Sequence, residues 1–249
     1  MSLFKGFVMS LGMFSIIPVP KNSWNDKYMP MIIPNLPLVG ALIGIIWYGS
    51  ASVMLMLSAP LMMHSAILLF IPFILNGFIH ADGFMDTVDA VFSRKNIDEK
   101  KRILKDPHVG SFAVIAVVGL IILQFSAVYT IVDTQKGLLI FVFIPVISRC
   151  IVGIAMLNLK PAFETGYNTL FRNNTKPRHT VLICLIMLIC LSVVWFWIGI
   201  MGMPLLAEAV VGIIATLYLY NHFQGMSGDL CGCIITVSEF AALFFMAIL

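Results

Sequence analysis

Three aspartates and a histidine lie within ten residues of this chain, in the segment HADGFMDTVD from His80 to Asp89. On a helix, the i, i+4, i+7 spacing of Asp82, Asp86 and Asp89 places their carboxylates on one face. Carboxylates crowded beside apolar surroundings repel one another and need a cation to neutralise them. Mg²⁺ favours carboxylate oxygens and usually takes substrate phosphates as further ligands. We therefore predict that these four residues are catalytic and that the three aspartates bind Mg²⁺.

His80 has three candidate roles, as a general base, a donor to phosphate or a support for the aspartates. The alternative for the whole segment is a solvated helix end whose acids offset the basic residues that follow it. The chain has only 12 acidic residues, and three of them are in this block. Since such crowding is costly beside a membrane, we favour the metal site.

A second group of polar residues runs from Lys105 to Ser111 and precedes a long apolar stretch. A lysine and a hydroxyl at the start of a helix are suited to binding phosphate. We predict that Lys105, Asp106 and Ser111 contact a phosphorylated substrate. Ordinary membrane helices begin in a similar way, so an ordinary helix start is the alternative.

A third group lies near the C-terminus. Asp229, Gly232, Thr236 and Glu239 are spaced 0, +3, +7 and +10, which makes one polar stripe on an otherwise apolar helix. Ser227 precedes this stripe by two residues. We predict that Ser227, Asp229 and Glu239 contribute to substrate binding.

Glu239 should lie well inside the bilayer, where an unpaired charge costs at least ~2.5–3.5 kcal/mol. Arg149, within another apolar run, is its natural partner, and we include Arg149 among the predicted substrate-binding residues. The alternative is a structural pair without chemistry. Glu208 is expected near the end of a span, reaching the membrane interface.

The composition indicates an integral membrane protein. Of the 249 residues, 60% are hydrophobic and only 11% are charged, whereas soluble domains carry roughly 25% charged residues. We predict one all-α domain over residues 1–249, with about seven transmembrane helices and a short N-terminal helix, interfacial or re-entrant, that ends before Pro18. The seven apolar runs are 32–57, 61–79, 109–132, 137–157, 180–201, 204–220 and 230–249. Pro60, Pro72, Pro145 and Pro204 should mark helix starts or kinks.

The basic residues predict the orientation. All of the 15 lysines and arginines except Lys136 and Arg149 lie in the N-terminal segment or in two longer polar connections, about 80–108 and 158–179. With seven spans these segments share one side, which the positive-inside rule makes cytoplasmic. We therefore expect a multi-pass protein of a bacterial or archaeal inner membrane with its acidic block facing the cytoplasm.

The three polar groups together resemble those of the cobalamin synthase family, the adenosylcobinamide-GDP ribazoletransferases. The family block H-x-D-G-x-x-D-T-x-D is matched from His80 to Asp89, and K-D-x-x-x-G is matched from Lys105 to Gly110. The element G-x-[ST]-G-D-x-x-G is matched from Gly225 to Gly232. This chain departs from the family in having Ala90 where a glycine is common and Thr236 where a carboxylate is common.

The resemblance implies a reaction. A hydroxyl of α-ribazole, or of its 5′-phosphate, attacks the phosphate nearest the cobinamide in adenosylcobinamide-GDP, and GMP leaves. The cofactor implied is Mg²⁺ on the pyrophosphate, and the partners are these two substrates and the lipid bilayer. We expect no nucleic-acid partner, and the sequence leaves a homo-oligomer open.

Two other functions fit parts of the pattern. CDP-alcohol phosphatidyltransferases are also membrane bundles with several aspartates on Mg²⁺, but their pattern has Ala-Arg where this chain has Asp86-Thr87. A secondary transporter would explain charges within the spans. It would not explain three aspartates beside a long basic connection.

Overall fold

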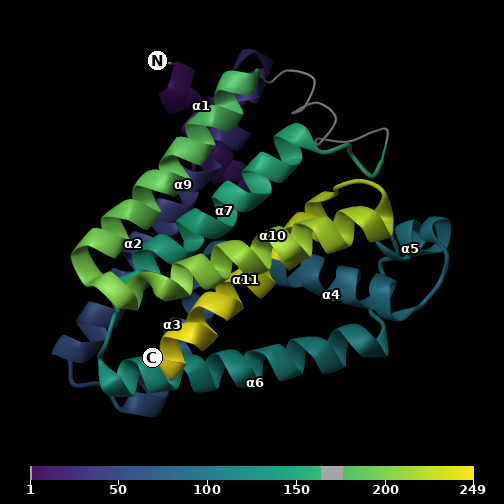
Figure 1. Cartoon of the computed structure of the whole chain (residues 1–249). Helices are drawn as coiled ribbons and strands as arrows, with labels where there is room; N and C mark the ends of the chain where they lie inside the picture. Colours follow the sequence, from purple (N-terminus) through teal and green to yellow (C-terminus); the bar gives the residue numbers. More distant parts are fainter. Residues whose placement is uncertain (1, 164–175) are drawn as a thin grey trace.

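The computed structural model describes residues 2–163 and 176–249, which form helices joined by short turns (Figure 1). The predicted all-α class is confirmed. The α-helices are α1 (Ser2–Phe14), α2 (Leu36–Met56), α3 (Leu61–Leu75), α4 (Ile79–Phe92), α5 (Ile97–Ile103), α6 (Ser111–Thr134), α7 (Ile140–Asn158), α9 (Pro177–Ile198), α10 (Met203–Phe223) and α11 (Gly228–Ile248). Short 3₁₀ helices are η1 (Lys21–Ser23), η2 (Asp26–Met31), η3 (Ile33–Asn35) and η4 (Gly199–Gly202).

Each of the seven predicted apolar runs forms a helix, because in hydrocarbon a segment must satisfy its own backbone polar groups. The prolines act as predicted. Pro60 is the N-cap of α3, and Pro204 lies in the first turn of α10. Pro72 and Pro145 lie inside α3 and α7. The predicted N-terminal helix is α1, whose 13 residues extend about 20 Å, less than the ~30 Å of a hydrocarbon core.

The predicted count of seven spans is not confirmed. Within the described ranges, five helical segments are long and apolar enough to cross a membrane, or up to six if the bent pair α3–α4 is one span. Helix α3 has only 15 residues, short of the ~20 that a straight span needs. Helices α9 and α10 are joined through η4 into one apolar segment of 47 residues, Pro177–Phe223. The chain is a multi-pass membrane protein.

The polar connection predicted at about 80–108 is instead largely helical, since it contains α4 and α5. Helix α4 follows α3 after a bend of 86°. Gly77 and Phe78, with φ of 61° and 62°, form this bend. The Phe78 amide donates to the Phe73 carbonyl at 2.9 Å, which closes the end of α3. The acidic block is helical, as its spacing predicted, and the bend directs this helix across the bundle.

Helix α7 is the centre of the bundle, since 15 of its 19 residues are buried, whereas only 3 of the 22 residues of α9 are buried. It packs closely on α2, because a Cβ atom at Gly40 or Gly44 would overlap the α7 backbone at Pro145 or Val142. Small residues of this kind let membrane helices approach. Trp47 of α2 stacks on Phe141 of α7, with ring centroids 4.5 Å apart.

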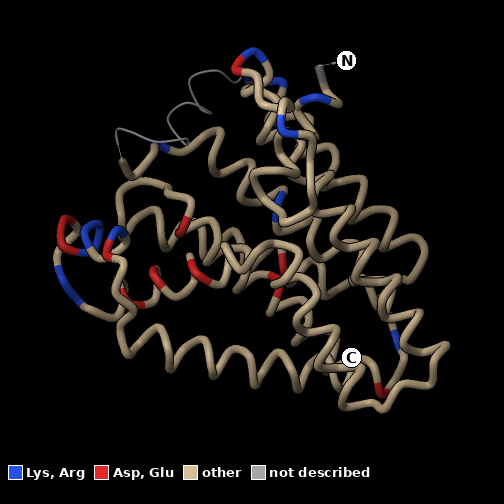
Figure 2. The backbone as a smooth tube through the Cα atoms, turned by 180° about the vertical axis from the view of Figure 1, so that it is seen from behind, with Lys and Arg blue, Asp and Glu red and all other residues tan. Residues whose placement is uncertain are grey.

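The polar connections meet at one end of the bundle. The Ala162 amide donates to the Met226 carbonyl at 2.8 Å, and the Met226 amide donates to the Lys160 carbonyl at 2.8 Å. Helix α5 contacts both α4 and α10. Figure 2 shows charged segments concentrated at the α5 and N-terminal ends, with few near the C-terminus. The rest of the predicted 158–179 connection, residues 164–175 with Arg172, lies outside the described residues.

Candidate active site

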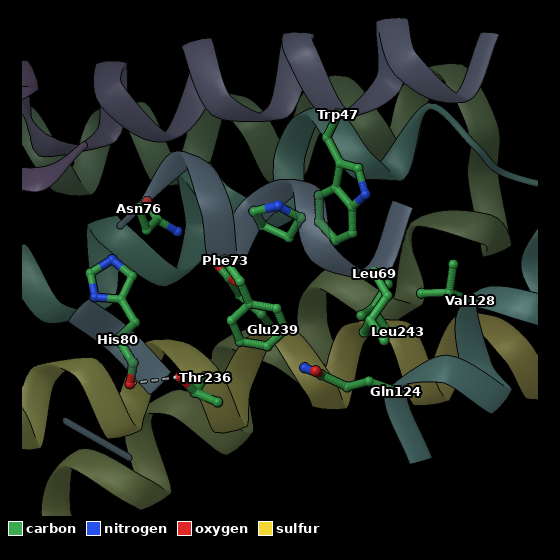
Figure 3. A pocket seen from close by; sticks show the side chains of 11 residues that line it. Trp47, Leu69, Phe73, Asn76, His80, Gln124, Val128, Thr236, Glu239 and Leu243 are labelled. Carbon is green, nitrogen blue, oxygen red and sulfur yellow. Dashed lines mark hydrogen bonds between the residues drawn. The ribbon is translucent and has the colours of Figure 1, made fainter. Parts of the chain in front are cut away.

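The acidic block and the C-terminal stripe meet where α4 crosses α11. A Cβ atom at Gly83 would lie 2.8 Å from the Cα atom of Asp229, so the two helices touch at this point. A Cβ atom at Gly232 would lie 3.1 Å from the Cα atom of His80. The Thr236 hydroxyl donates to the His80 carbonyl at 3.1 Å (Figure 3). Two motifs that are about 140 residues apart in the sequence therefore form one site.

Three carboxylates gather at this crossing. Asp82 is exposed, and Asp86 and Asp229 are half-buried. The negative charges of Asp82, Asp229 and Asp89 all act on Asp86. Within the described chain, no lysine or arginine pairs with any of them. The crossing is therefore an uncompensated concentration of negative charge, which favours a bound cation.

The residues at the crossing fit an ion that takes part of its coordination from substrate. Within the described ranges, no three His, Cys, Asp or Glu side chains form a complete metal-binding group. Mg²⁺ seldom uses such a group, since it usually binds one or two carboxylates, waters and substrate phosphates. Asp82 and Asp86, one helical turn apart, have the donor chemistry for this mode.

Asp89 has a different environment. Its Oδ2 atom accepts a hydrogen bond from the Gly110 amide at 2.6 Å, and its Oδ1 atom accepts one from the Ala113 amide at 3.0 Å. Asp89 thus caps the N-terminus of α6. A Cβ atom at Gly110 would lie only 2.5 Å from this carboxylate, so the contact requires glycine. This bond joins the second predicted group to the acidic block.

The other members of the second group are at the exposed start of α6. The Lys105 ammonium lies 4.0 Å from the centre of the Phe163 ring. Asp106 accepts a hydrogen bond from the His108 ring at 2.6 Å. This bond lowers the pKa of Asp106. Ser111 is exposed as the first residue of α6.

Ser227 is the N-cap of α11, and its Oγ atom accepts a hydrogen bond from the Leu230 amide at 3.3 Å. This cap fixes the first turn of α11, where Asp229 lies. The N-terminus of a helix carries partial positive charge. The turn therefore offers backbone N–H groups beside the carboxylates, as a phosphate site requires.

Arg149 and Glu239 form the predicted pair, in the interior behind the crossing. Arg149 Nη1 lies 2.6 Å from Glu239 Oε1, and the arginine side chain is 1% exposed. Arg149 Nη2 donates to Asn76 Oδ1 at 3.1 Å, and the Ser148 hydroxyl donates to Glu239 Oε1 at 2.8 Å. Asn76, at the end of α3, was not predicted. The sequence did contain a signal for this residue, because Asn76 is an asparagine near the end of an apolar run, just before the acidic block.

His80 lies between the crossing and this buried pair. It is 8% exposed, and its ring, Asn76 and Glu239 line a cavity of about 20 Å³ (Figure 3). Its Nε2 atom has no hydrogen-bond partner among the described residues. His80 thus contacts α11 through its carbonyl, and its ring shares a cavity with the buried pair.

Glu208 was predicted at the membrane interface, and that prediction is wrong. The residue is 0% exposed, on the face of α10 that packs on α7 and α11. Neither carboxylate oxygen has a hydrogen-bond partner in the described part of the chain. The Arg149–Glu239 pair lies near enough to interact electrostatically with the Glu208 carboxyl. Whether Glu208 is buried depends on the rotation of α10 about its axis. The position of a residue along the span does not predict that rotation.

A larger cavity of about 310 Å³ opens beside the carboxylates. Asp82, Asp229 and His80 lie on one side of it. Apolar residues from α1, α2, α7 and α11 line the rest, including Met13, Phe14, Leu36, Val152, Met156 and Ile235. The sequence analysis missed these residues, because nothing distinguishes them from other members of apolar runs.

Comparisons with known proteins agree with the three motifs. A family model described as cobalamin-5-phosphate synthase matches residues 6–247. An adenosylcobinamide-GDP ribazoletransferase of Clostridium perfringens (strain SM101) is 33% identical over 247 residues, covering 99% of this chain and 98% of that protein. One of Clostridium botulinum (strain Alaska E43) is 34% identical, covering 98% and 97%. One of Geobacillus thermodenitrificans is 28% identical, covering 95% and 93%. No solved structure matches.

Proposed function

Because this chain belongs to the cobalamin-5-phosphate synthase family, we propose that it is an adenosylcobinamide-GDP ribazoletransferase of the cytoplasmic membrane. It joins α-ribazole, or its 5′-phosphate, to the cobinamide phosphate of adenosylcobinamide-GDP. A phospholipid enzyme and a transporter, the two alternatives left open by the sequence, are not favoured by this membership.

The reaction replaces a phosphoanhydride bond of the donor with a phosphate ester bond to the acceptor. A ribose hydroxyl oxygen of the acceptor forms a bond to the phosphorus nearest the cobinamide. The bond from that phosphorus to the bridging pyrophosphate oxygen breaks, and GMP leaves with the electron pair. The hydroxyl proton passes to a base. Such transfers depend on positioning and charge neutralisation more than on covalent catalysis.

The observation that carries the proposal is the α4–α11 crossing, where Asp82, Asp86 and Asp229 lie together without a basic partner. Asp82 and Asp86 are the residues that would hold Mg²⁺. When bound, the ion would neutralise charge on the pyrophosphate. We assign the hydroxyl proton to Asp229, which faces these two aspartates from α11, and to His80 the role of supporting α4.

The apolar cavity beside Asp82 and Asp229 suits the acceptor. α-Ribazole consists of an apolar aromatic base joined to a ribose. With the base in the apolar part of the 310 Å³ cavity, the ribose hydroxyls would face the two carboxylates. Val152→Phe, which fills the cavity, should raise the KM for α-ribazole more than the KM for the donor. Val146→Phe, on α7 but not lining this cavity, is the control, and equal effects of the two would refute this placement.

The activity is tested with purified protein, adenosylcobinamide-GDP and α-ribazole. We expect GMP release with adenosylcobalamin formation, both dependent on Mg²⁺. Asp82→Asn should prevent turnover, while Asp133→Asn, at the exposed far end of α6, should not. GMP release that persists in Asp82→Asn, or that needs no divalent ion, would contradict the assigned site.

The orientation is tested by labelling from each side of the membrane. A cysteine at Asp98 in α5 should react with an impermeant maleimide only from the cytoplasm. A cysteine at Lys136, in the turn after α6, should react only from outside. The parent protein measures the background of its own five cysteines. The reverse pattern would overturn the proposed topology.

A further inference from the structure

A second polar pocket lies at the other end of α4 from His80. Its volume is about 340 Å³. Its lining comes from the end of α4, the turn after it, α5 and the last turns of α10: Val91, Phe92, Arg94, Lys100, Tyr218 and His222. Of these, Arg94 and Lys100 belong to the basic connection predicted at about 80–108.

The lining is basic and contains no carboxylate. Arg94 and Lys100 form no ion pair within the described residues. Arg94 has a φ of 54°, so the chain turns sharply at this residue as it leaves α4. Two uncompensated cations facing one pocket are suited to a phosphate or pyrophosphate.

Aromatic rings form the rest of the wall. Tyr218 and His222 lie one turn apart on α10, with ring centroids 4.0 Å apart. Tyr218 is 47% exposed, and Phe92 is 57% exposed. Exposed aromatic faces beside cations accept the planar base of a nucleotide, because every base has a stacking face.

The position of the pocket relative to the carboxylates matches an extended ligand. Phe92 follows Asp86 by six residues of α4, which is about 9 Å along the axis. This separation is comparable to the reach of a nucleoside diphosphate from its terminal phosphate to its base. Along the helix axis, the nucleoside of a donor whose pyrophosphate is at the carboxylates would therefore be level with the aromatic wall.

We propose that this pocket, defined by Phe92, Arg94, Lys100, Tyr218 and His222, binds the guanosine nucleotide half of the donor. The assignment rests on the proposed function, since it gives the leaving GMP its own binding site. It separates the three parts of the reaction: the nucleotide near α5 and α10, the pyrophosphate at Asp82 and Asp86, and the acceptor in the apolar cavity.

The test is direct binding of GDP to the purified full-length protein in nanodiscs of neutral lipid with Mg²⁺. Lys100→Gln and Tyr218→Leu should each weaken GDP binding roughly tenfold. Both should raise the KM for adenosylcobinamide-GDP and leave the KM for α-ribazole unchanged. The matched controls are Lys101→Gln, a neighbouring lysine that does not line the pocket, and Tyr129→Leu on α6.

The outcomes separate this proposal from the proposed function. If wild-type protein turns over and both variants keep wild-type GDP binding and donor KM, the pocket is wrong and the function stands. If GDP binds and the variants weaken it but no transfer occurs, the function fails and the pocket stands. If GDP does not bind in neutral lipid and the variants only reduce retention of phosphatidylglycerol, the pocket is a lipid headgroup site and the proposal is overturned.

Discussion

Two polar clusters each include one acidic residue of α11, Asp229 or Glu239, about three turns apart, and they differ in how their charges are balanced. In the inner cluster the charges are paired, since Glu239 accepts hydrogen bonds from Arg149 and Ser148. The outer cluster holds Asp82, Asp86 and Asp229 with no basic partner in the described chain. A paired charge within the bilayer is explained by the protein itself. An unpaired group of acids at a cavity mouth requires a ligand from outside.

The difference suggests a division of labour within one bundle. The inner cluster joins α3, α7 and α11 through Asn76, Arg149 and Glu239. It therefore fixes the bend at which α4 begins. The outer cluster is displayed on α4 and α11 at the polar end. We regard Arg149 and Glu239 as positioning residues, and their direct contact with substrate stays a prediction.

The largest expected effect is on catalysis at the outer cluster. Asp86→Asn should lower the rate of GMP release roughly a thousandfold or more, because the ion that neutralises the pyrophosphate loses a ligand. The thermal unfolding temperature should stay equal or rise, since a repulsive charge is removed. If the variant loses activity only because it unfolds, Asp86 is a structural residue, and the distinction between the two clusters fails.

At the inner cluster the main effect should be on stability. Arg149→Met leaves Glu239 buried without its partner, which costs about 3–5 kcal/mol. The double variant Arg149→Met with Glu239→Leu should recover most of that loss in detergent unfolding assays. If Arg149→Met folds as well as wild type but does not turn over, the inner cluster is catalytic.

Asp89 tests the boundary between the two roles. Asp89→Asn keeps one acceptor for the α6 N-terminus but loses the charge, and it should cost about 1 kcal/mol of stability. Turnover should fall far less than in Asp86→Asn, because both Asp89 oxygens already accept backbone hydrogen bonds. Equal losses of turnover in the two variants would instead indicate that Asp89 binds the metal ion.

Glu208 should give the smallest effect. The buried carboxyl has no hydrogen-bond partner among the described residues, so Glu208→Gln breaks no hydrogen bond and should change stability by less than about 1 kcal/mol. Unfolding of the purified variant measures this. A loss of several kcal/mol would show that Glu208 belongs to the paired inner cluster.

The sequence predicted the helices well, because hydrophobic runs and prolines act locally. It also predicted the Arg149–Glu239 pair, since two opposite charges in apolar runs must meet. It did not predict that Asp229 joins Asp82 and Asp86, although Gly83 and Gly232 permit that contact. The burial of Glu208 and the capping role of Asp89 depend on how whole helices rotate and pack, which no local pattern records.

The central claim is that the outer carboxylates bind a divalent cation together with the donor's pyrophosphate. Binding of Mn²⁺, followed by electron paramagnetic resonance in the presence of adenosylcobinamide-GDP, tests it without relying on turnover. Wild type and Asp133→Asn should bind the ion with equal affinity, and Asp86→Asn should bind it at least about tenfold more weakly. Equal Mn²⁺ affinity in Asp86→Asn and wild type would contradict the account.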